Sequence, residues 1–509
     1  MLFIYINNTK GEDIMKKLAF DNNLYLEMQS KHILERISQF DNKLYLEFGG
    51  KLFDDLHASR VLPGFQPDSK LQMLLTLKDQ VEVIIALNAN DIEQNKMRGD
   101  LGITYDEDTL RLIDAFREAG LYVGSVVITH FENQPNTLKF CALLDKLGIK
   151  TYYHYPIEGY PSNVSHIVSD EGFGKNDYIE TSKPLVVVTA PGPGSGKMAT
   201  CLSQLYHEHK RGVNAGYAKY ETFPVWNLPL KHPVNLAYEA ATADLNDINM
   251  IDPFHLEAYG ETTVNYNRDV EIFPVLKTMF EKISGSSPYQ SPTDMGVNMA
   301  GHAIIDNDAA IQASKDEIVR RYYIAIEDHR KNLASLATIE KLELIMSQAD
   351  VTKDERKCVQ VALDKSAATD GKPAFAIELN DGTIVTGKTT NLLGAASAAL
   401  LNSLKILGNI HDDIPLISPN IINPIQELKT QNLGNNNPRL HIDEVLIALA
   451  VSATTNPISH QALQQLEKLS GTQAHSTVIL NEDDKNILRK LNVSLTCSPV
   501  YSTKKLYHK

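Results

Sequence analysis

The chain has 509 residues, with 49 Lys and Arg against 63 Asp and Glu, so its formal net charge is −14. Hydrophobic residues make up 43% and charged residues 22%, which is typical of globular proteins and excludes a wholly disordered chain. An acidic chain lacks the positive charge that attracts nucleic acids and anionic membranes, so we expect no nucleic-acid partner and no membrane partner. The longest apolar runs are strand-length and fall short of the roughly 18 residues that a membrane helix needs.

The four cysteines predict a reducing environment. They are far apart in the chain and form no Cys-x-x-Cys pair: Cys141, Cys201, Cys358 and Cys497. Small secreted domains instead carry closely spaced cysteines that form a disulfide framework. The sequence therefore predicts a soluble protein of the cytoplasm.

The first fourteen residues, MLFIYINNTKGEDI, begin with an apolar run that is too short for a secretory signal. No basic flank precedes this run, and no small-residue cleavage site follows it. Met15-Lys16-Lys17 is typical of a bacterial start, and codons for Lys10-Gly11-Glu12 can contain a purine-rich ribosome-binding sequence. We expect residues 1–14 to be a disordered start-site extension and the protein to begin at Met15.

Residues 15–240 form the first predicted domain, and from about residue 40 onward its sequence alternates between strand and helix patterns. β-branched and aromatic runs predict strands, and amphipathic segments that end on glycine predict helices at 106–120 and 136–148. The predicted strands lie at 44–48, 81–87, 122–131, 150–155 and 185–190. Continuously apolar strands separated by helices predict a doubly wound, mostly parallel sheet, and hence a Rossmann-like or P-loop-like α/β domain.

The rest of the chain divides into three predicted segments: a mixed connecting segment at 241–307, a helical segment at 308–371 and a C-terminal α/β (α+β) domain at 372–509. Within the helical segment, apolar spacing predicts helix through 308–350. The last domain begins with a predicted hairpin at 375–386 around Asp381-Gly382. Further helices are predicted at 391–407, 441–453, 459–469 and 482–491, with strands at 476–480 and 493–497. The fold class is therefore multidomain α/β with a helical insertion.

Residues 185–205, LVVVTAPGPGSGKMATCLSQL, run from a buried strand through a glycine-rich loop into an amphipathic helix. Glycines let backbone N–H groups turn toward an anion, while the helix N-terminus and a lysine add positive charge. We therefore predict a phosphate-binding loop formed by Gly192, Gly194, Ser195, Gly196 and Lys197. The alternative is a strand-to-helix turn that needs glycine only for its geometry.

This loop departs twice from the strict motif G-x-x-x-x-G-K-[ST]. Pro191 stands where the first glycine belongs, and Met198 where the magnesium-binding hydroxyl belongs. Thr200 lies two residues further along, and Ser195 is the alternative hydroxyl. We expect a nucleotide with magnesium as the ligand. Cys201 lies in the first helical turn, where a thiolate would be stabilised, but no base accompanies it, so we do not predict a nucleophile.

Residues 382–389, GTIVTGKT, match the strict motif letter for letter. Their β-branched middle residues continue a strand out of a hairpin turn, so we predict no P-loop there. A predicted helix rich in small residues follows, and its start would suit an anion. We name Lys388, Thr389, Thr390 and Asn391 as a second candidate group, with a plain helix N-cap at Thr390 or Asn391 as the alternative.

Candidate catalytic residues come from PTDMGVNMAGHAIIDND at 292–308. If this segment is helical, Asp294, Asn298 and His302 share a face, and Asp294 or His302 would supply acid/base or metal contacts. The alternative is a capped helix with solvated acids. Asp252 ends INMID at 248–252 and has the position of a Walker B aspartate, with turn capping before Pro253 as the alternative.

Three histidines lie at the ends of predicted strands. His130 and His154 follow neighbouring strands, where parallel sheets bind ligands, although a structural role is common for either residue. His475 opens a later strand and would contribute to a polar pocket. No His or Cys cluster has zinc spacing.

Five blocks in the same order resemble a conserved bacterial family of about 500 residues that is catalogued as uncharacterised, with a domain of unknown function. The blocks are APGPGSGKMAT, YETFPVWNLPLKHPVNLAYEAATADL, SPTDMGVNMAG, GKTTNLLGA and AHSTVIL. The resemblance runs from Met15 to about Tyr501 and implies a cytoplasmic, multidomain α/β protein. It implies no reaction and no catalytic residues, so the functional prediction depends on the residues alone.

The glycine loop predicts an enzyme that acts on a phosphorylated small molecule or nucleotide, by phosphoryl-transfer or phosphate-ester chemistry. In this prediction the C-terminal region closes over the substrate with Lys388–Asn391. Two alternatives stay open: an enzyme that uses a dinucleotide or another cofactor, and a non-catalytic nucleotide or metabolite sensor. Proteins of this size are often homo-oligomers.

Overall fold

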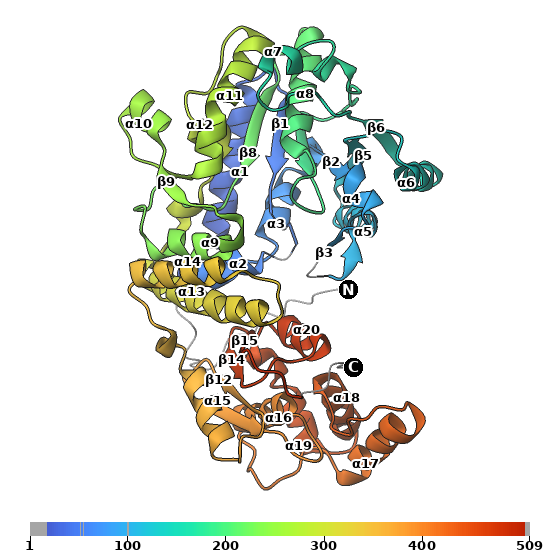
Figure 1. Cartoon of the computed structure of the whole chain (residues 1–509), viewed down its shortest axis with the longest axis vertical. Helices are drawn as coiled ribbons and strands as arrows, with labels where there is room; N and C mark the ends of the chain where they lie inside the picture. Colours follow the sequence, from blue (N-terminus) through green and yellow to red (C-terminus); the bar gives the residue numbers. More distant parts are fainter. Residues whose placement is uncertain (1–17, 51, 54, 99–100, 504–509) are drawn as a thin grey trace. The chain divides into compact units, whose positions relative to one another are not determined.

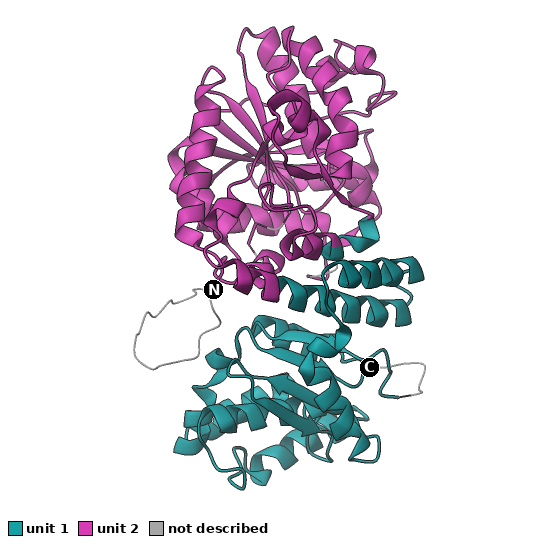
Figure 2. Ribbon diagram, turned by 90° about the vertical axis from the view of Figure 1, so that its left-hand side faces the viewer, with its two compact units in different colours: residues 1–17, 240–245, 314–509 teal, residues 18–239, 246–313 magenta. Residues whose placement is uncertain are grey.

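The computed structural model describes residues 18–50, 52–53, 55–98 and 101–503. Its contacts divide the chain into two compact units, coloured separately in Figure 2. We call the first the N-terminal unit; it consists of Leu18–Glu239 and Asn246–Ala313. The described part of the second, the C-terminal unit, consists of 240–245 and 314–503. The predicted start-site extension at 1–14 lies outside the described residues.

A seven-stranded sheet forms the centre of the N-terminal unit, and all its strand pairs are parallel (Figure 1). Its strand order is β11-β8-β1-β7-β2-β5-β6. The five predicted strands all belong to it, as β1 (Leu44–Phe48), β2 (Val81–Asn88), β5 (Tyr122–Thr129), β6 (Lys150–Tyr153) and β7 (Leu185–Thr189). The predicted parallel sheet is therefore confirmed.

The sequence analysis missed two strands of this sheet, β8 (Gly216–Tyr220) and β11 (Gly296–Val297). β8, GYAKY, carries Lys219 in the middle of a buried run, so it lacks the apolar pattern of its neighbours. The lysine is tolerated because Asp269 bonds to its ammonium group and Glu221 Oε1 lies 3.2 Å from it. β11 is only two residues long, too short for any periodicity to reveal.

Helices cover both faces of the sheet, as a doubly wound fold requires. On one face, Tyr25 of α1 (Asn22–Ser38) bonds through its hydroxyl to that of Tyr220 at 2.6 Å. On the other, Tyr45 of β1 donates to Glu208 of α8 (Lys197–Lys210) at 2.8 Å. The predicted helices are present as α5 (Tyr105–Glu118) and α6 (Pro135–Lys146).

The connecting region contains short elements. It holds α9 (Pro233–Ala241), the antiparallel pair β9 (Asn249–Ile251) and β10 (Val264–Tyr266), α10 (Pro253–Tyr259), α11 (Asn267–Ser284) and α12 (Pro292–Met295). The helix predicted through 308–350 is two helices, α13 (Asn307–Arg330) and α14 (Leu336–Gln348). The break contains Asn332 at φ 61°, a left-handed conformation that an α-helix does not contain.

The C-terminal unit is built on a four-stranded mixed sheet of order β13-β12-β14-β15. β12 (Ala374–Glu378) and β13 (Ile384–Lys388) form the predicted hairpin, while β14 (Gln473–Ser476) and β15 (Ser494–Cys497) are parallel. The strand predicted at 476–480 is wrong in position, because β14 ends at Ser476. The helices are α15 (Lys357–Ala367), α16 (Ala395–Leu407), α17 (Pro419–Glu427), α18 (Ile442–Ala453), α19 (Pro457–Leu463) and α20 (Glu482–Lys490).

All four cysteines are free and buried, which confirms the absence of a disulfide framework. Across the described ranges, we find no helix with both the length and the apolar character needed to cross a bilayer.

Candidate functional site

A cavity of about 420 Å³ lies at the carboxyl end of the parallel sheet in the N-terminal unit. Its walls come from the segments that follow β1 and β7, which are adjacent strands, and from α5. From β1 the chain continues to β2 on one side, and from β7 it continues to β8 on the other. Such a reversal point opens a crevice between the two connections, and open α/β sheets bind ligands there. The cavity is therefore where this topology favours a binding site.

The predicted phosphate-binding loop forms one wall of the cavity. Ala190, Pro191, Gly192 and Pro193 line it together with Lys197, whereas the predicted residues Gly194, Ser195 and Gly196 do not. Gly194 and Gly196 have φ values of +77° and +81°, a backbone region that glycine enters without strain. Gly192 is required for a different reason: a Cβ there would lie 2.2 Å from the hydroxyl oxygen of Tyr105.

Donors from neighbouring strand ends hold the carbonyl groups of the loop. The Asn88 amide, at the end of β2, donates to Gly194 O at 3.2 Å, and the Thr129 hydroxyl, at the end of β5, donates to Ser195 O at 2.9 Å. By contrast, no backbone hydrogen bond joins the N–H groups of Gly194, Gly196 and Lys197 to another described residue. The loop therefore keeps free backbone donors directly before the N-terminus of α8, the arrangement that binds anions.

Two arginines on other elements also line the cavity, and the sequence analysis missed both. Arg98 ends β3 (Met97–Arg98), which pairs with β4 (Ile103–Thr104), and Arg111 lies on α5. They share one carboxylate: Arg98 Nη1 donates to Asp108 Oδ2 at 2.9 Å, and Arg111 Nε donates to Asp108 Oδ1 at 2.6 Å. Asp108 is fully buried, so it fixes both guanidinium groups. The Asp108–Arg111 spacing of i, i+3 was the available sequence signal.

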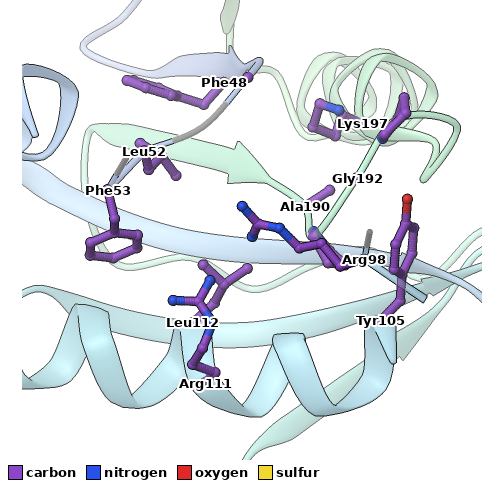
Figure 3. A pocket seen from close by; sticks show the side chains of 13 residues that line it. Phe48, Leu52, Phe53, Arg98, Tyr105, Arg111, Leu112, Ala190, Gly192 and Lys197 are labelled. Carbon is purple, nitrogen blue, oxygen red and sulfur yellow. The ribbon is translucent and has the colours of Figure 1, made fainter. Parts of the chain in front are cut away.

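Apolar side chains form the part of the cavity opposite the loop: Phe48, Leu52, Phe53 and Leu112. Phe48 stacks on Tyr220 with ring centroids 4.1 Å apart, and Phe53 packs against Phe116 at 5.2 Å. In Figure 3 the Arg98 guanidinium lies between this apolar group and the loop that carries Gly192. The cavity thus has Lys197 at the loop, apolar side chains on the opposite part, and the two arginines between and beside them.

Neither predicted hydroxyl faces the cavity as a magnesium ligand would. Ser195 is fully buried and donates to Gly192 O at 2.8 Å, so its hydroxyl closes the loop on itself. Thr200 is also fully buried and does not line the cavity. The expectation of a stabilised thiolate at Cys201 is wrong, because burial, with Glu47 nearby, raises the pKa of that thiol well above its usual value.

The predicted face of Asp294, Asn298 and His302 does not form, because α12 ends at Met295 and the chain enters β11. Asp294 accepts from the backbone N–H of Ser291 at 3.1 Å in a capping box, and from the Tyr259 hydroxyl at 2.9 Å. His302 is exposed in a short 3₁₀ turn. Neither lines the cavity, and the alternative of a capping role is confirmed for Asp294.

Asp252 also has a capping role. It is the N-cap of α10, accepting from the N–H groups of Phe254 and His255, and it accepts from the Thr293 hydroxyl at 2.7 Å. Its strand, β9, pairs only with β10 and lies outside the large sheet, so the Walker B interpretation is wrong.

Two of the three strand-end histidines are structural, and the third does not line the cavity. His154 is buried, with Nε2 3.2 Å from the Gln204 amide, and burial lowers its pKa to about 3. His475 is held between the hydroxyls of Thr496 and Ser498 at 2.9 and 3.0 Å, and its pKa is also lowered to about 3 by burial. His130 is exposed.

The second candidate group, Lys388–Asn391, runs from the end of a strand into a loop and does not begin a helix. β13 ends at Lys388, and α16 starts at Ala395 with Gly394 as its N-cap. The Thr390 hydroxyl accepts from the N–H groups of Leu392 and Leu393 at 3.2 and 3.0 Å. The helix-start argument for anion binding is therefore wrong here, as is the alternative N-cap at Thr390 or Asn391.

Among the described residues, no group of three or more His, Cys, Asp or Glu side chains is arranged to hold a metal ion. The described residues of the cavity lining likewise include no carboxylate, imidazole or thiol. The side chains that do converge there are cationic and aromatic.

Comparison with known proteins gives matches over nearly the whole chain. Residues 18–350 match the N-terminal part of the domain of unknown function DUF1846, and residues 354–507 match its C-terminal part. A UPF0371 protein of Streptococcus sanguinis (strain SK36) is 59% identical over 495 residues, which cover 97% of this chain and 100% of that protein. A UPF0371 protein of Streptococcus pneumoniae (strain JJA) is 58% identical over the same shares.

Proposed function

The chain belongs to the bacterial UPF0371 family, built from the two parts of a domain of unknown function, and from its cavity we propose that it binds a phosphorylated small molecule or nucleotide. One observation carries the proposal. The start of the glycine loop, the Lys197 side chain and two arginines line one cavity at the reversal point of the sheet.

The charge of the lining favours a phosphate group over an uncharged ligand. Lys197, Arg98 and Arg111 give the lining three cationic side chains, and both arginines bond to Asp108. The arginines are held in place before a ligand arrives, so little side-chain entropy is lost on binding. A phosphate dianion suits these cationic side chains.

The residues that line the cavity support ligand binding more directly than they support a catalysed reaction. Phosphoryl transfer needs a group that orients or deprotonates the nucleophile, usually a carboxylate or an imidazole. The described lining contains neither, which favours a second candidate function, a non-catalytic nucleotide or metabolite sensor. If the ligand is turned over, Asp294 and His302 are not expected to take part.

The test is a thermal-shift and calorimetric screen of the full chain against nucleotides, dinucleotides, sugar phosphates and inorganic phosphate, with and without magnesium. A ligand at about 100 times its Kd stabilises the folded state by about 2.7 kcal/mol, a readily measured shift. Lys197→Ala is expected to weaken binding by more than about tenfold, as loss of a charge-assisted contact of about 1.5–3 kcal/mol implies.

Lys146→Ala is the matched control, because it removes the same charge from the exposed end of α6. It is expected to leave the affinity unchanged. A ligand-induced shift that ignores Lys197, or no shift from any phosphate compound, would overturn the proposal. If a phosphate ligand does bind through Lys197, measuring whether a product forms from it would decide between an enzyme and a sensor.

A further inference from the structure

The cavity has the glycine loop and Lys197 on one side and most of its apolar side chains on the other, and this arrangement narrows the class of ligand that can fill it. The loop and Lys197 occupy one wall, and Phe48, Leu52, Phe53 and Leu112 occupy the opposite part. A free phosphate or a sugar phosphate would leave the apolar part in contact with water. A ligand that fills both parts gains the hydrophobic contribution as well as the ionic one.

Two aromatic side chains of the apolar part pack against neighbouring rings. Phe48 is only 1% exposed and is fixed by its stack on Tyr220, while Phe53 is half-buried and held by Phe116. Aromatic side chains that are already held in place favour ligands with flat rings. Stacking such a ring requires little movement of the protein and tolerates many ring substituents. The Arg111 guanidinium lies 6.0 Å from the centre of the Phe53 ring and adds a second planar surface beside it.

Arg98 lies between the two parts, anchored to Asp108. Its position suits a polar or anionic group in the middle of the ligand, between the phosphate and the ring. The ordered series of phosphate, polar centre and flat ring is the chemistry of a nucleotide. A cavity of about 420 Å³ lies within the 300–1,000 Å³ of small-molecule sites.

We infer that the site selects a nucleoside phosphate, with its phosphate on the glycine loop and Lys197 and its base against Phe53. This inference rests on the proposed function but goes further, because it assigns specificity to the aromatic part. A sugar phosphate is then a weak ligand, because it fills only the part of the cavity next to the glycine loop and Lys197.

The test compares four probes on the full chain by calorimetry: inorganic phosphate, ribose 5-phosphate, adenosine and adenosine 5′-monophosphate, followed by the other three nucleoside monophosphates. At least one nucleoside monophosphate is expected to bind about tenfold or more tightly than ribose 5-phosphate, since stacking one base contributes about 1–3 kcal/mol. Equal affinities for ribose 5-phosphate and all four nucleotides would overturn the inference and leave the proposed function intact.

Substitutions at Phe53 and Lys197 distinguish the contacts of the ligand's base from those of its phosphate. Phe53→Leu and Phe53→Ala are expected to remove most of the nucleotide's advantage and to leave ribose 5-phosphate binding unchanged. Lys197→Ala is expected to weaken both. Tyr155→Ala, which truncates a partly exposed aromatic side chain outside the cavity, serves as the control.

The outcomes distinguish the two proposals. If Phe53→Leu weakens nucleotide and ribose 5-phosphate equally, the aromatic part does not read the base and the inference is wrong. If nucleotides bind through Phe53 but ignore Lys197, the phosphate site of the proposed function is wrong. If Phe53→Ala does not fold, the wild-type probe series still decides the question.

Discussion

Two stretches of the chain contain Gly-Lys within a phosphate-loop pattern, and their backbones differ. One forms a loop before a helix, and the other forms part of a strand. Residues 190–197 depart from the strict motif, yet they form a loop with left-handed glycines, free N–H groups and a following helix. Residues 382–389 match the motif fully, yet 384–388 form strand β13 of a hairpin. The motif specifies residues that allow a loop to form. Where β-branched residues lie between its glycines, they favour an extended strand instead.

The glycines of the two stretches also serve different purposes. Gly194 has φ +77° and open space around the position of a Cβ, so it is needed for its backbone conformation. Gly387 has an ordinary φ, but a Cβ there would lie 2.2 Å from Ala399 N and 2.5 Å from Ala395 O. It is therefore needed for the close approach of β13 to α16. The same residue type supports a candidate binding loop in one unit and helix–sheet packing in the other.

The largest expected effect comes from Gly387→Ala. Because the new methyl group would meet backbone atoms of α16, which cannot rotate away, we expect a loss of about 3 kcal/mol or more in the C-terminal unit. Hydrogen exchange followed by mass spectrometry would show faster exchange in β12, β13 and α16. Peptides from β7 and α8 should be unchanged, and a stable C-terminal unit would contradict the close-approach argument.

His154 in the N-terminal unit and His475 in the C-terminal unit are both buried and neutral, so acid should destabilise both units. The folded-state pKa values of His154 and His475 are about 3, below the value of about 6.5 in an unfolded chain. Their stabilising contribution is present above pH 6.5 and is lost as the pH falls toward 3, by up to about 2 kcal/mol each between pH 7 and pH 5. His154→Gln should flatten this dependence in β5–β6 peptides, and His475→Gln in β14–β15 peptides. A pH dependence that survives each substitution would reject these assignments.

Gly194→Ala should have a smaller effect, because nothing obstructs its methyl group and only the left-handed φ is unfavourable. We expect a loss of about 1 kcal/mol. Slower or weaker ligand binding should accompany it if the loop relaxes to another backbone conformation. Hydrogen exchange of α8 peptides measures the stability, and calorimetry measures the affinity. An effect as large as that of Gly387→Ala would mean that the loop is packed more tightly than the structure shows.

Lys388→Ala should have the smallest effect. The side chain is exposed at the end of β13, and the turn after it is held by Thr390. We expect less than about 0.5 kcal/mol in stability and no change in the affinity for any phosphate ligand that Lys197 binds. A loss of affinity equal to that of Lys197→Ala would restore Lys388–Asn391 as part of the binding site.

The sequence by itself determined the parallel core and the position of the loop. Strands such as 81–87 and 185–190 are apolar throughout, so burial on both faces follows from their composition, and the glycines of 192–196 mark the loop between strand and helix. β8 was missed because the buried charge of Lys219 depends on partners such as Asp269, fifty residues later in the chain. Local patterns carry no information about such a partner.

Only the tertiary structure decided what faces the cavity. Arg98, Arg111 and Phe53 come from segments with no recognisable motif, and they meet the loop because the strand order places β1 beside β7. Packing also ends α12 at Met295, so Asp294 and His302 do not share a helical face, and it starts α16 at Ala395, so Lys388–Asn391 do not begin a helix. The sequence sets the spacing of residues that are close together in the chain. Which distant residues meet at a site depends on which strands pair, and that pairing depends on the whole core.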